Sequence, residues 1–300
     1  MGNLSFQEKL YSGRYFTGDD LQVIRQIIPQ TELYPTRASI ARAVCLELAW
    51  FRLDGRLKDM SAKVALLRMH REGIITLPAP RNTGGNRLGQ RQPKLTPASE
   101  PGPLVVGTRA DLGILSLSRV ENKGESKLWN EFIERYHYLG YTPLPGAQIR
   151  YFIEGGGQLL GAVGAGASAW TVSSRDRFIG WSSDERKSHL HFVVNNARFL
   201  IFPWIRVKNL ASSVLSLLAR QIRGDWKGLY GFEPVLLETF VDSGRFNGTC
   251  YQAANWIWVG QTQGCGKMGK NRRQRGFRVK DVYLYPLTPD FRQILTERKV

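Results

Sequence analysis

The sequence predicts an α+β protein in which a helical N-terminal domain precedes a larger mixed α/β domain. Three observations predict this division. Residues 1–78 repeat apolar side chains at the spacing of amphipathic helices. Residues 79–107 have no such period and are rich in Pro, Gly, Arg and Gln, which is typical of a linker. Residues 108–300 mix helical stretches with short apolar runs and a hairpin signal, which favours α+β over a doubly wound parallel sheet.

The N-terminal domain is expected to hold three helices followed by a short strand at 74–77. The helices are expected at 19–30, 36–53 and 58–72. In the third, Met60, Val64, Leu67 and His70 are expected to face the core. Three helices and a strand are the outline of a winged helix-turn-helix, whose third helix enters the major groove of DNA.

The third helix also supplies basic side chains for a DNA contact. The candidates are Lys58, Lys63, Arg68 and Arg71. The same pattern fits an ordinary three-helix packing unit with a solvated basic face, so the sequence leaves both readings open.

The larger domain is expected to alternate helices and strands. Helices are expected at 128–138, 211–224 and 249–256, and strands at 148–154, 158–169, 190–195, 235–241, 258–261 and 280–286. The first two strands flank the turn Gly155-Gly156-Gly157, which predicts a hairpin.

The charge of the chain is concentrated in two short segments. The net charge is +17, and segments 81–94 and 267–280 contain four and seven basic residues without any acid. Concentrated positive charge predicts a polyanionic partner, most often nucleic acid, although a solvated tail would give the same pattern. The candidates for DNA binding in the second segment are Lys267, Lys270, Arg272, Arg273 and Arg275.

Several classes of protein are excluded by composition. The longest apolar runs are far shorter than the ~20 residues of a membrane span. The N-terminus lacks the order of a signal peptide, so we expect a cytoplasmic protein with no membrane partner. Cys45, Cys250 and Cys265 are too few and too scattered for a zinc site or a disulfide framework.

Long motifs in the larger domain carry a resemblance to a known family. They read YHYLGY at 136–141, NNARFLIFPWIRVKNLAS at 195–212 and LLETFVDSGRFNGTCYQAANW at 236–256. In this order the motifs resemble the A-subunit family of the Druantia anti-phage defence system, over roughly residues 36 to 287. The resemblance implies a role in antiviral defence alongside other subunits, including a helicase-like protein. It implies no settled catalytic activity.

The same domain is similar, more distantly, to the GNAT acyltransferase fold. The resemblance lies in the order of elements, in which a long strand leads through a turn into a helix and a later strand precedes a helix with a tyrosine. In GNAT enzymes this turn holds the pyrophosphate of acetyl-CoA at a helix N-terminus. Here the turn runs from Arg206 to Ala211, and Asn209 replaces the expected glycine, which argues against acetyl-CoA.

Four side chains of this domain are candidates for catalysis. His137 is either a candidate acid or base, because imidazole titrates near neutrality, or a structural histidine packed by tyrosines at the end of a helix. Glu238 and Asp242 lie four residues apart on a predicted strand and so share one face, where they are candidate ligands of Mg²⁺ for phosphodiester cleavage. Tyr251 fits a general acid, a nucleophile or a core aromatic. No other cofactor is indicated.

Basic side chains next to these candidates complete a predicted cleft. Arg198 lies in an apolar run and is either ion-paired with Glu238 or Asp242 or a ligand of phosphate. Arg206 and Lys208 are further candidate contacts to DNA. The sequence therefore predicts a nucleic-acid-binding defence component that recognises DNA through a basic cleft. The alternatives are a DNA-processing enzyme with nuclease or strand-transfer chemistry and, less favoured, an acyl-CoA-dependent transferase.

Overall fold

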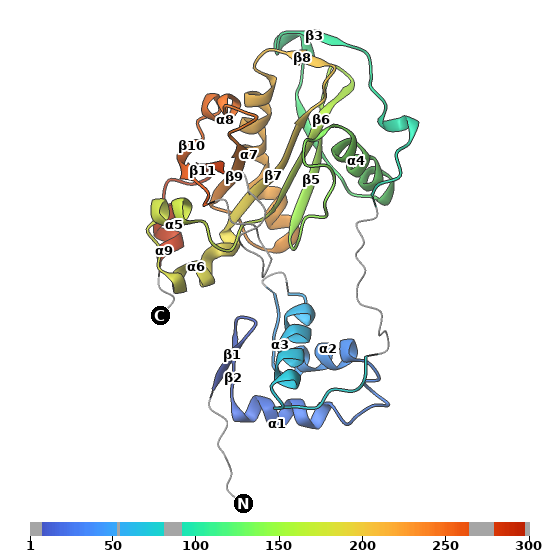
Figure 1. Cartoon of the computed structure of the whole chain (residues 1–300), viewed down its shortest axis with the longest axis vertical. Coiled ribbons are helices and arrows are strands. Elements are labelled where there is room, and N and C mark those ends of the chain that lie inside the picture. Colours follow the sequence, from blue (N-terminus) through green and yellow to red (C-terminus); the bar gives the residue numbers. More distant parts are fainter. Residues whose placement is uncertain (1–7, 53–54, 81–91, 264–278, 298–300) are drawn as a thin grey trace, which may run out of the picture. The chain divides into compact units, whose positions relative to one another are not determined.

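A computed structural model describes residues 8–52, 55–80, 92–263 and 279–297, and the chain divides into two compact units (Figure 1). Unit 1 spans Met1–Gly89 and unit 2 spans Gln90–Val300.

The described residues of unit 1 form a small hairpin and three helices. They are β1 (Lys9–Tyr11), β2 (Arg14–Phe16), α1 (Gly18–Ile27), α2 (Arg37–Glu47) and α3 (Asp59–Arg71). Thr17 and Thr36 begin α1 and α2, because each side chain accepts a hydrogen bond from the backbone three residues later in a capping box. The three predicted helices are thus confirmed, although α2 ends six residues earlier than expected.

The predicted buried face of α3 was wrong. Met60 and Val64 are 64% and 42% exposed, whereas the buried side chains are Ala62, Ala65, Leu66 and Met69. The buried side of α3 combines two alanines with Leu66 and Met69, and a prediction led by the large apolar residues Met60 and Val64 selects the wrong side of the helix.

The winged helix-turn-helix is not confirmed. Residues 74–77 form no strand, and the two strands of unit 1 precede its first helix instead of following its third. Ile75 and Leu77 are nevertheless buried, because they pack as an extended segment against the helices. An apolar run of this length indicates burial and does not by itself specify a strand.

Unit 2 is a mixed α/β fold built on a seven-stranded sheet. The described strands of unit 2, two of which lie outside that sheet, are β3 (Val105–Gly107), β4 (Ser116–Arg119), β5 (Gln148–Gly155), β6 (Gln158–Ala167), β7 (Val193–Ile201), β8 (Ile205–Val207), β9 (Leu236–Asp242), β10 (Ile257–Gln261) and β11 (Lys280–Pro286). Its α-helices are α4 (Lys123–Tyr136), α5 (Ser173–Ile179), α6 (Ser183–His189), α7 (Leu210–Tyr230), α8 (Thr249–Ala253) and α9 (Phe291–Thr296). Short 3₁₀ turns lie at Pro97–Ser99, Ala110–Leu112 and Leu190–Phe192.

The main sheet has the order β10-β11-β9-β7-β6-β5-β4, and β3 and β8 form a separate parallel pair. Within the main sheet only β7 and β9 are parallel, and α7 connects them. The hairpin β5–β6, the strand β7 leading into α7, and β9 followed by the tyrosine-bearing α8 follow the order expected of a GNAT-like core. One helix, α4, precedes the hairpin.

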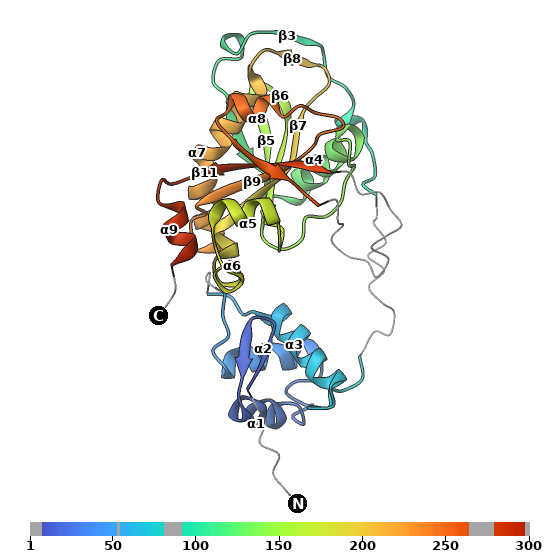
Figure 2. The same ribbon diagram turned by 60° about the vertical axis from the view of Figure 1, so that its left-hand side comes forward.

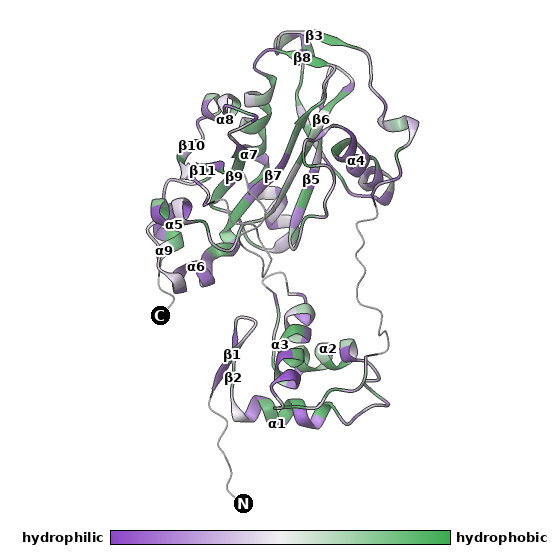
Figure 3. Cartoon of the chain, in the orientation of Figure 1, coloured by the Kyte–Doolittle hydropathy of each residue, from purple (hydrophilic) through white to green (hydrophobic). Residues whose placement is uncertain are grey.

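Helices cover both faces of this sheet (Figures 1 and 2). Neighbouring residues of β5 point to opposite faces, and they contact different helices. The Tyr151 hydroxyl hydrogen-bonds Asp225 of α7, whereas Phe152 packs edge-to-face on Phe132 of α4. The strands are correspondingly apolar along much of their length (Figure 3), as expected where both faces are buried.

The sheet opens between its two parallel strands. The pairing of β7 with β9 ends at Asn195 and Glu238, so the two strands continue beyond that point without ladder pairing. In the same part of β7 the residue Ala197 has no partner in β6, which makes a β-bulge between Asn196 and Arg198. Bulges bend a strand and redirect its side chains.

Candidate functional site

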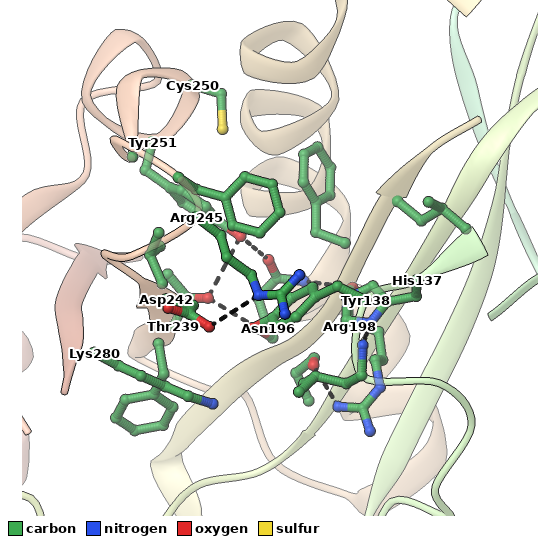
Figure 4. Close-up of a pocket in the computed structure, with 18 of the residues that line it drawn as sticks. His137, Tyr138, Asn196, Arg198, Thr239, Asp242, Arg245, Cys250, Tyr251 and Lys280 are labelled. Atoms are coloured by element: carbon green, nitrogen blue, oxygen red, sulfur yellow. Dashed lines mark hydrogen bonds and ion pairs between the residues drawn. The ribbon is translucent and has the colours of Figure 1, made fainter. Parts of the chain in front are cut away.

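A pocket of about 680 Å³ lies where β7 and β9 separate (Figure 4). Its walls come from the C-terminal end of α4 and the residues after it, the second half of β7, the end of β9 with the following loop, α8, and the first residue of β11. Since β9, its following loop and α8 are continuous, four stretches of chain that are distant in sequence meet at one cavity.

Three cationic side chains and a single carboxylate line the described part of this pocket. The cations are Arg198 of β7, Arg245 of the loop after β9 and Lys280 of β11, and the carboxylate is Asp242. Arg245 Nε lies 3.5 Å from Asp242 Oδ2. Within the described residues neither Arg198 nor Lys280 has a carboxylate oxygen within 4 Å, and Arg198 Nε is buried without a hydrogen-bond partner.

The environment of these groups disfavours positive charge. Burial lowers the pKa of Arg198, and burial together with the nearby Arg198 charge lowers the pKa of Lys280, with Asp242 acting in the opposite direction. His137, at the end of α4, responds most strongly. Burial, Arg198 and Lys280 together lower its pKa to about 4, so its imidazole is neutral at pH 7.

The tautomer of His137 follows from its backbone contact. The Leu139 N–H donates to His137 Nδ1 at 3.3 Å, so in the neutral ring the proton is on Nε2. A neutral ring with an occupied Nδ1 donates a hydrogen bond more readily than it accepts a proton.

The floor of the pocket is a fixed polar network. The Tyr251 hydroxyl donates to Asn196 Oδ1 at 2.9 Å, and the Thr239 hydroxyl donates to the Asn196 carbonyl at 3.0 Å. Burial raises the pKa of Tyr251, so its phenol keeps its proton. The network joins β7, β9 and α8 across the opening of the sheet.

Two aromatic rings lie among the cations of the pocket lining. Tyr138 and Phe246 pack edge-to-face with their centroids 5.4 Å apart, and the Arg245 guanidinium lies 5.4 Å from the Tyr138 centroid. Phe246 is 49% exposed. The pocket thus combines positive charge with an accessible aromatic surface.

Comparison with known proteins identifies the family. The family model described as Druantia protein DruA matches residues 68–273, which is more than half of the chain. The chain belongs to the DruA family. Membership implies a role in the Druantia anti-phage system, which has several subunits. No curated protein matches the chain.

Solved structures similar to this DruA family member are N-acetyltransferases of low identity. One is a spermidine N-acetyltransferase SpeG chimera from Vibrio cholerae and hSSAT, with 11% identity, a TM-score of 0.36, and coverage of 58% of this chain and 95% of that one. Another is an N-acetyltransferase from Staphylococcus aureus Mu50, with 12% identity, a TM-score of 0.34, and coverage of 58% and 99%.

The structure brings most of the predicted cleft of this DruA family member together. His137, Arg198, Asp242 and Tyr251 all line the pocket, although they come from four different elements. Among the described residues Arg198 forms no ion pair with Glu238 or Asp242, and its other predicted role, a ligand of phosphate, stays a prediction.

Glu238 is not part of the pocket lining. Its carboxylate is fully buried, lies 2.8 Å from Arg175 Nη1, and accepts a hydrogen bond from the Ala169 backbone at 2.9 Å. Residues four apart on a strand are separated by about 13 Å along it, too far to share one ion. The structure therefore does not bring Glu238 and Asp242 together as ligands of Mg²⁺, and the described residues contain no group of three or more His, Cys, Asp and Glu that could hold a metal.

The turn before α7 keeps the backbone of a glycine turn without the glycine. Asn209 has φ +62°, a left-handed conformation that asparagine tolerates better than most residues. Its exposed side chain adds atoms where glycine would leave room, so the fit to the pyrophosphate of acetyl-CoA stays incomplete. Arg206 and Lys208 are exposed at this turn and do not line the pocket.

The remaining predicted DNA contacts lie elsewhere. On α3, Lys58, Arg68 and Arg71 are exposed, whereas Lys63 is half-buried and pairs with Asp59 at 3.0 Å. The basic residues Lys267, Lys270, Arg272, Arg273 and Arg275 lie outside the described residues. In the ranges that the structure describes, no helix is both long and apolar enough to cross a membrane.

Sequence reasoning missed part of the site. Arg245, Phe246 and Tyr138 line the pocket, and none was a predicted site residue. Arg245 and Phe246 belong to the run SGRFNG directly after the strand β9. The available signal was a basic and an aromatic residue in a glycine-flanked loop at the end of a strand, because such loops often carry binding residues.

Proposed function

We propose that the chain is the DNA-binding component of its Druantia system and that the pocket between β7 and β9 holds DNA phosphate. The observation that carries this proposal is the charge of the pocket, where Arg198, Arg245 and Lys280 face the carboxylate of Asp242. A cleft lined mainly by one sign of charge attracts ligands of the other sign.

The electrostatic environment supports an anionic ligand. Burial lowers the pKa of both Arg198 and Lys280, which means that their charged forms are destabilised in the empty pocket. A phosphate placed between them would relieve that cost, and charge-assisted hydrogen bonds from guanidinium and ammonium groups to phosphate are strong. The neutral His137 adds an Nε2–H donor without adding charge.

The exposed basic residues of α3 extend the proposal. Lys58, Arg68 and Arg71 are exposed on unit 1, and we propose that they add sequence-independent contacts to the DNA backbone. In this proposal the helicase-like partner implied by the family resemblance works on the DNA that this chain holds.

Titrations with labelled DNA at several salt concentrations test the proposal. In the double variant Arg198→Gln, Lys280→Gln we expect the affinity to fall by at least about tenfold and the slope of log K against log salt to decrease by about 2, because two phosphate contacts are lost. The matched control is Arg177→Gln, Lys127→Gln, which neutralises exposed basic residues outside the pocket lining. Equal affinities for the two double variants would refute pocket binding.

A further inference from the structure

The aromatic part of the pocket indicates which form of DNA fits it. Tyr138 follows α4 and Phe246 follows β9, yet their rings meet at 5.4 Å beside the Arg245 guanidinium. Half of Phe246 is open to solvent. Exposed rings interleaved with cationic groups are the combination on which proteins stack unpaired bases.

The placement of the cations adds a second constraint. Arg198 and Lys280 are half-buried within the cavity, so a phosphate must enter the pocket to reach them. In a duplex the base faces are stacked inside the helix and cannot contact a protein ring while the backbone is bound. An unpaired strand exposes a base and its phosphate together, and a cavity of about 680 Å³ is large enough for a single nucleotide.

We propose that the pocket takes one nucleotide of an unpaired DNA strand, with its phosphate on Arg198 and Lys280 and its base against Tyr138 and Phe246. This inference rests on the proposed function, since it presupposes that DNA binds here, and it adds the form of the substrate. The polar floor made by Asn196, Thr239 and Tyr251 is already hydrogen-bonded, so recognition by this pocket depends on stacking and charge more than on base edges.

The test compares single-stranded DNA of about 12 nucleotides, the scale of single-strand binding sites, with a duplex of the same sequence. We expect the full chain to bind the single strand at least about tenfold more tightly. Phe246→Ala and Phe246→Leu should each lose about tenfold in affinity for the single strand, because neither side chain stacks, and should bind the duplex as the unchanged protein does. Trp170→Ala, which removes an exposed aromatic residue outside the pocket lining, serves as the matched control.

A fluorescent base provides a readout that affinity alone does not. With 2-aminopurine in the strand, binding should change the emission, and Phe246→Leu should abolish the change at protein concentrations that saturate the strand. Competition with deoxyadenosine monophosphate separates a strand from a free nucleotide: displacement of the strand at equal affinity would overturn the proposal.

Two outcomes distinguish this inference from the proposed function. If single strand and duplex bind equally and Phe246→Ala behaves as Trp170→Ala does, while the Arg198→Gln, Lys280→Gln variant still loses affinity, the unpaired-strand proposal is wrong and phosphate binding at the pocket stands. If no form of DNA binds, both fail.

Discussion

Two clusters of charged side chains lie along strand β9. The cluster at Glu238 has as many carboxylates as guanidiniums, whereas the described residues of the cluster at Asp242 have more cations than carboxylates. At the first end two guanidiniums, Arg175 and Arg186, meet the carboxylates of Glu238 and Asp176 at 2.8–3.1 Å. We call these four residues the Arg175 cluster. At the other end, Arg198, Arg245 and Lys280 line the pocket with Asp242 as the one carboxylate among its described residues, and Asp242 pairs with Arg245.

The two clusters differ in how their buried charges are paired. A buried charge is tolerated when it is paired and hydrogen-bonded, and the Arg175 cluster meets that condition, with the Arg175 guanidinium also 5.4 Å from the Trp181 ring. The pocket does not meet it, because Arg198 and Lys280 lack carboxylate partners among the described residues. An external anion is what would complete the pocket.

The largest effect is expected when the Arg175 cluster loses one of its carboxylates. Glu238→Gln removes one of the two carboxylates that pair with the fully buried Arg175 and leaves the Arg175 cluster with one excess positive charge, so the free energy of unfolding should fall by about 3–5 kcal/mol. Chemical denaturation measures this loss. The control Asp184→Asn removes a partner of Lys187 in an exposed pair and should change nothing measurable. A Glu238→Gln protein as stable as this control would show that the cluster does not stabilise the fold.

The comparison also shows how far the sequence predicts this molecule. The helix α7 and the strands β9 and β11 were predicted within a few residues of their ends, except that α7 extends six residues further, because long amphipathic or uniformly apolar runs are strong local signals. Val214 and Leu218 of α7 are buried, as apolar residues four apart on one face of a helix indicate. The short strands β1, β3 and β8 were missed, since three residues carry too little periodicity.

The pocket could be predicted only in part, since it depends on topology. His137 and Lys280 are more than a hundred residues apart in sequence, and they meet because β11 pairs with β9 and α4 packs near β7. The sequence predicted that Glu238 and Asp242 act together, because residues four apart on a strand share one face of it. A shared face does not bring them close, because residues four apart on a strand lie about 13 Å apart along it, and of the two only Asp242 lines the pocket beyond the point where β7 and β9 cease to pair.

A smaller effect on stability is expected from pH, because it changes the protonation of His137 in the unfolded chain. The His137 pKa of about 4 lies below the ordinary value of 6.5, so below pH 6.5 the unfolded chain binds a proton that the folded chain does not. Stability should therefore fall as the pH drops from 6.5 to 4. Denaturation at both pH values should show that His137→Gln loses about 2 kcal/mol less than the unchanged protein over this window. Parallel pH profiles would contradict the assignment.

The smallest effect, and the one that most directly separates binding from catalysis, is expected at Asp242. Its Oδ1 accepts a hydrogen bond from the Gly244 backbone at 3.1 Å, and an asparagine oxygen can take over that contact. Asp242→Asn should therefore fold normally while removing the negative charge that faces Arg198, Arg245 and Lys280. Because repulsion of phosphate is reduced, the affinity for single-stranded DNA should rise about threefold. If Asp242 instead served as a ligand of Mg²⁺ in DNA cleavage, the variant would lose a Mg²⁺-dependent nuclease activity. A fall in the affinity for single-stranded DNA would contradict the argument that the Asp242 charge repels phosphate.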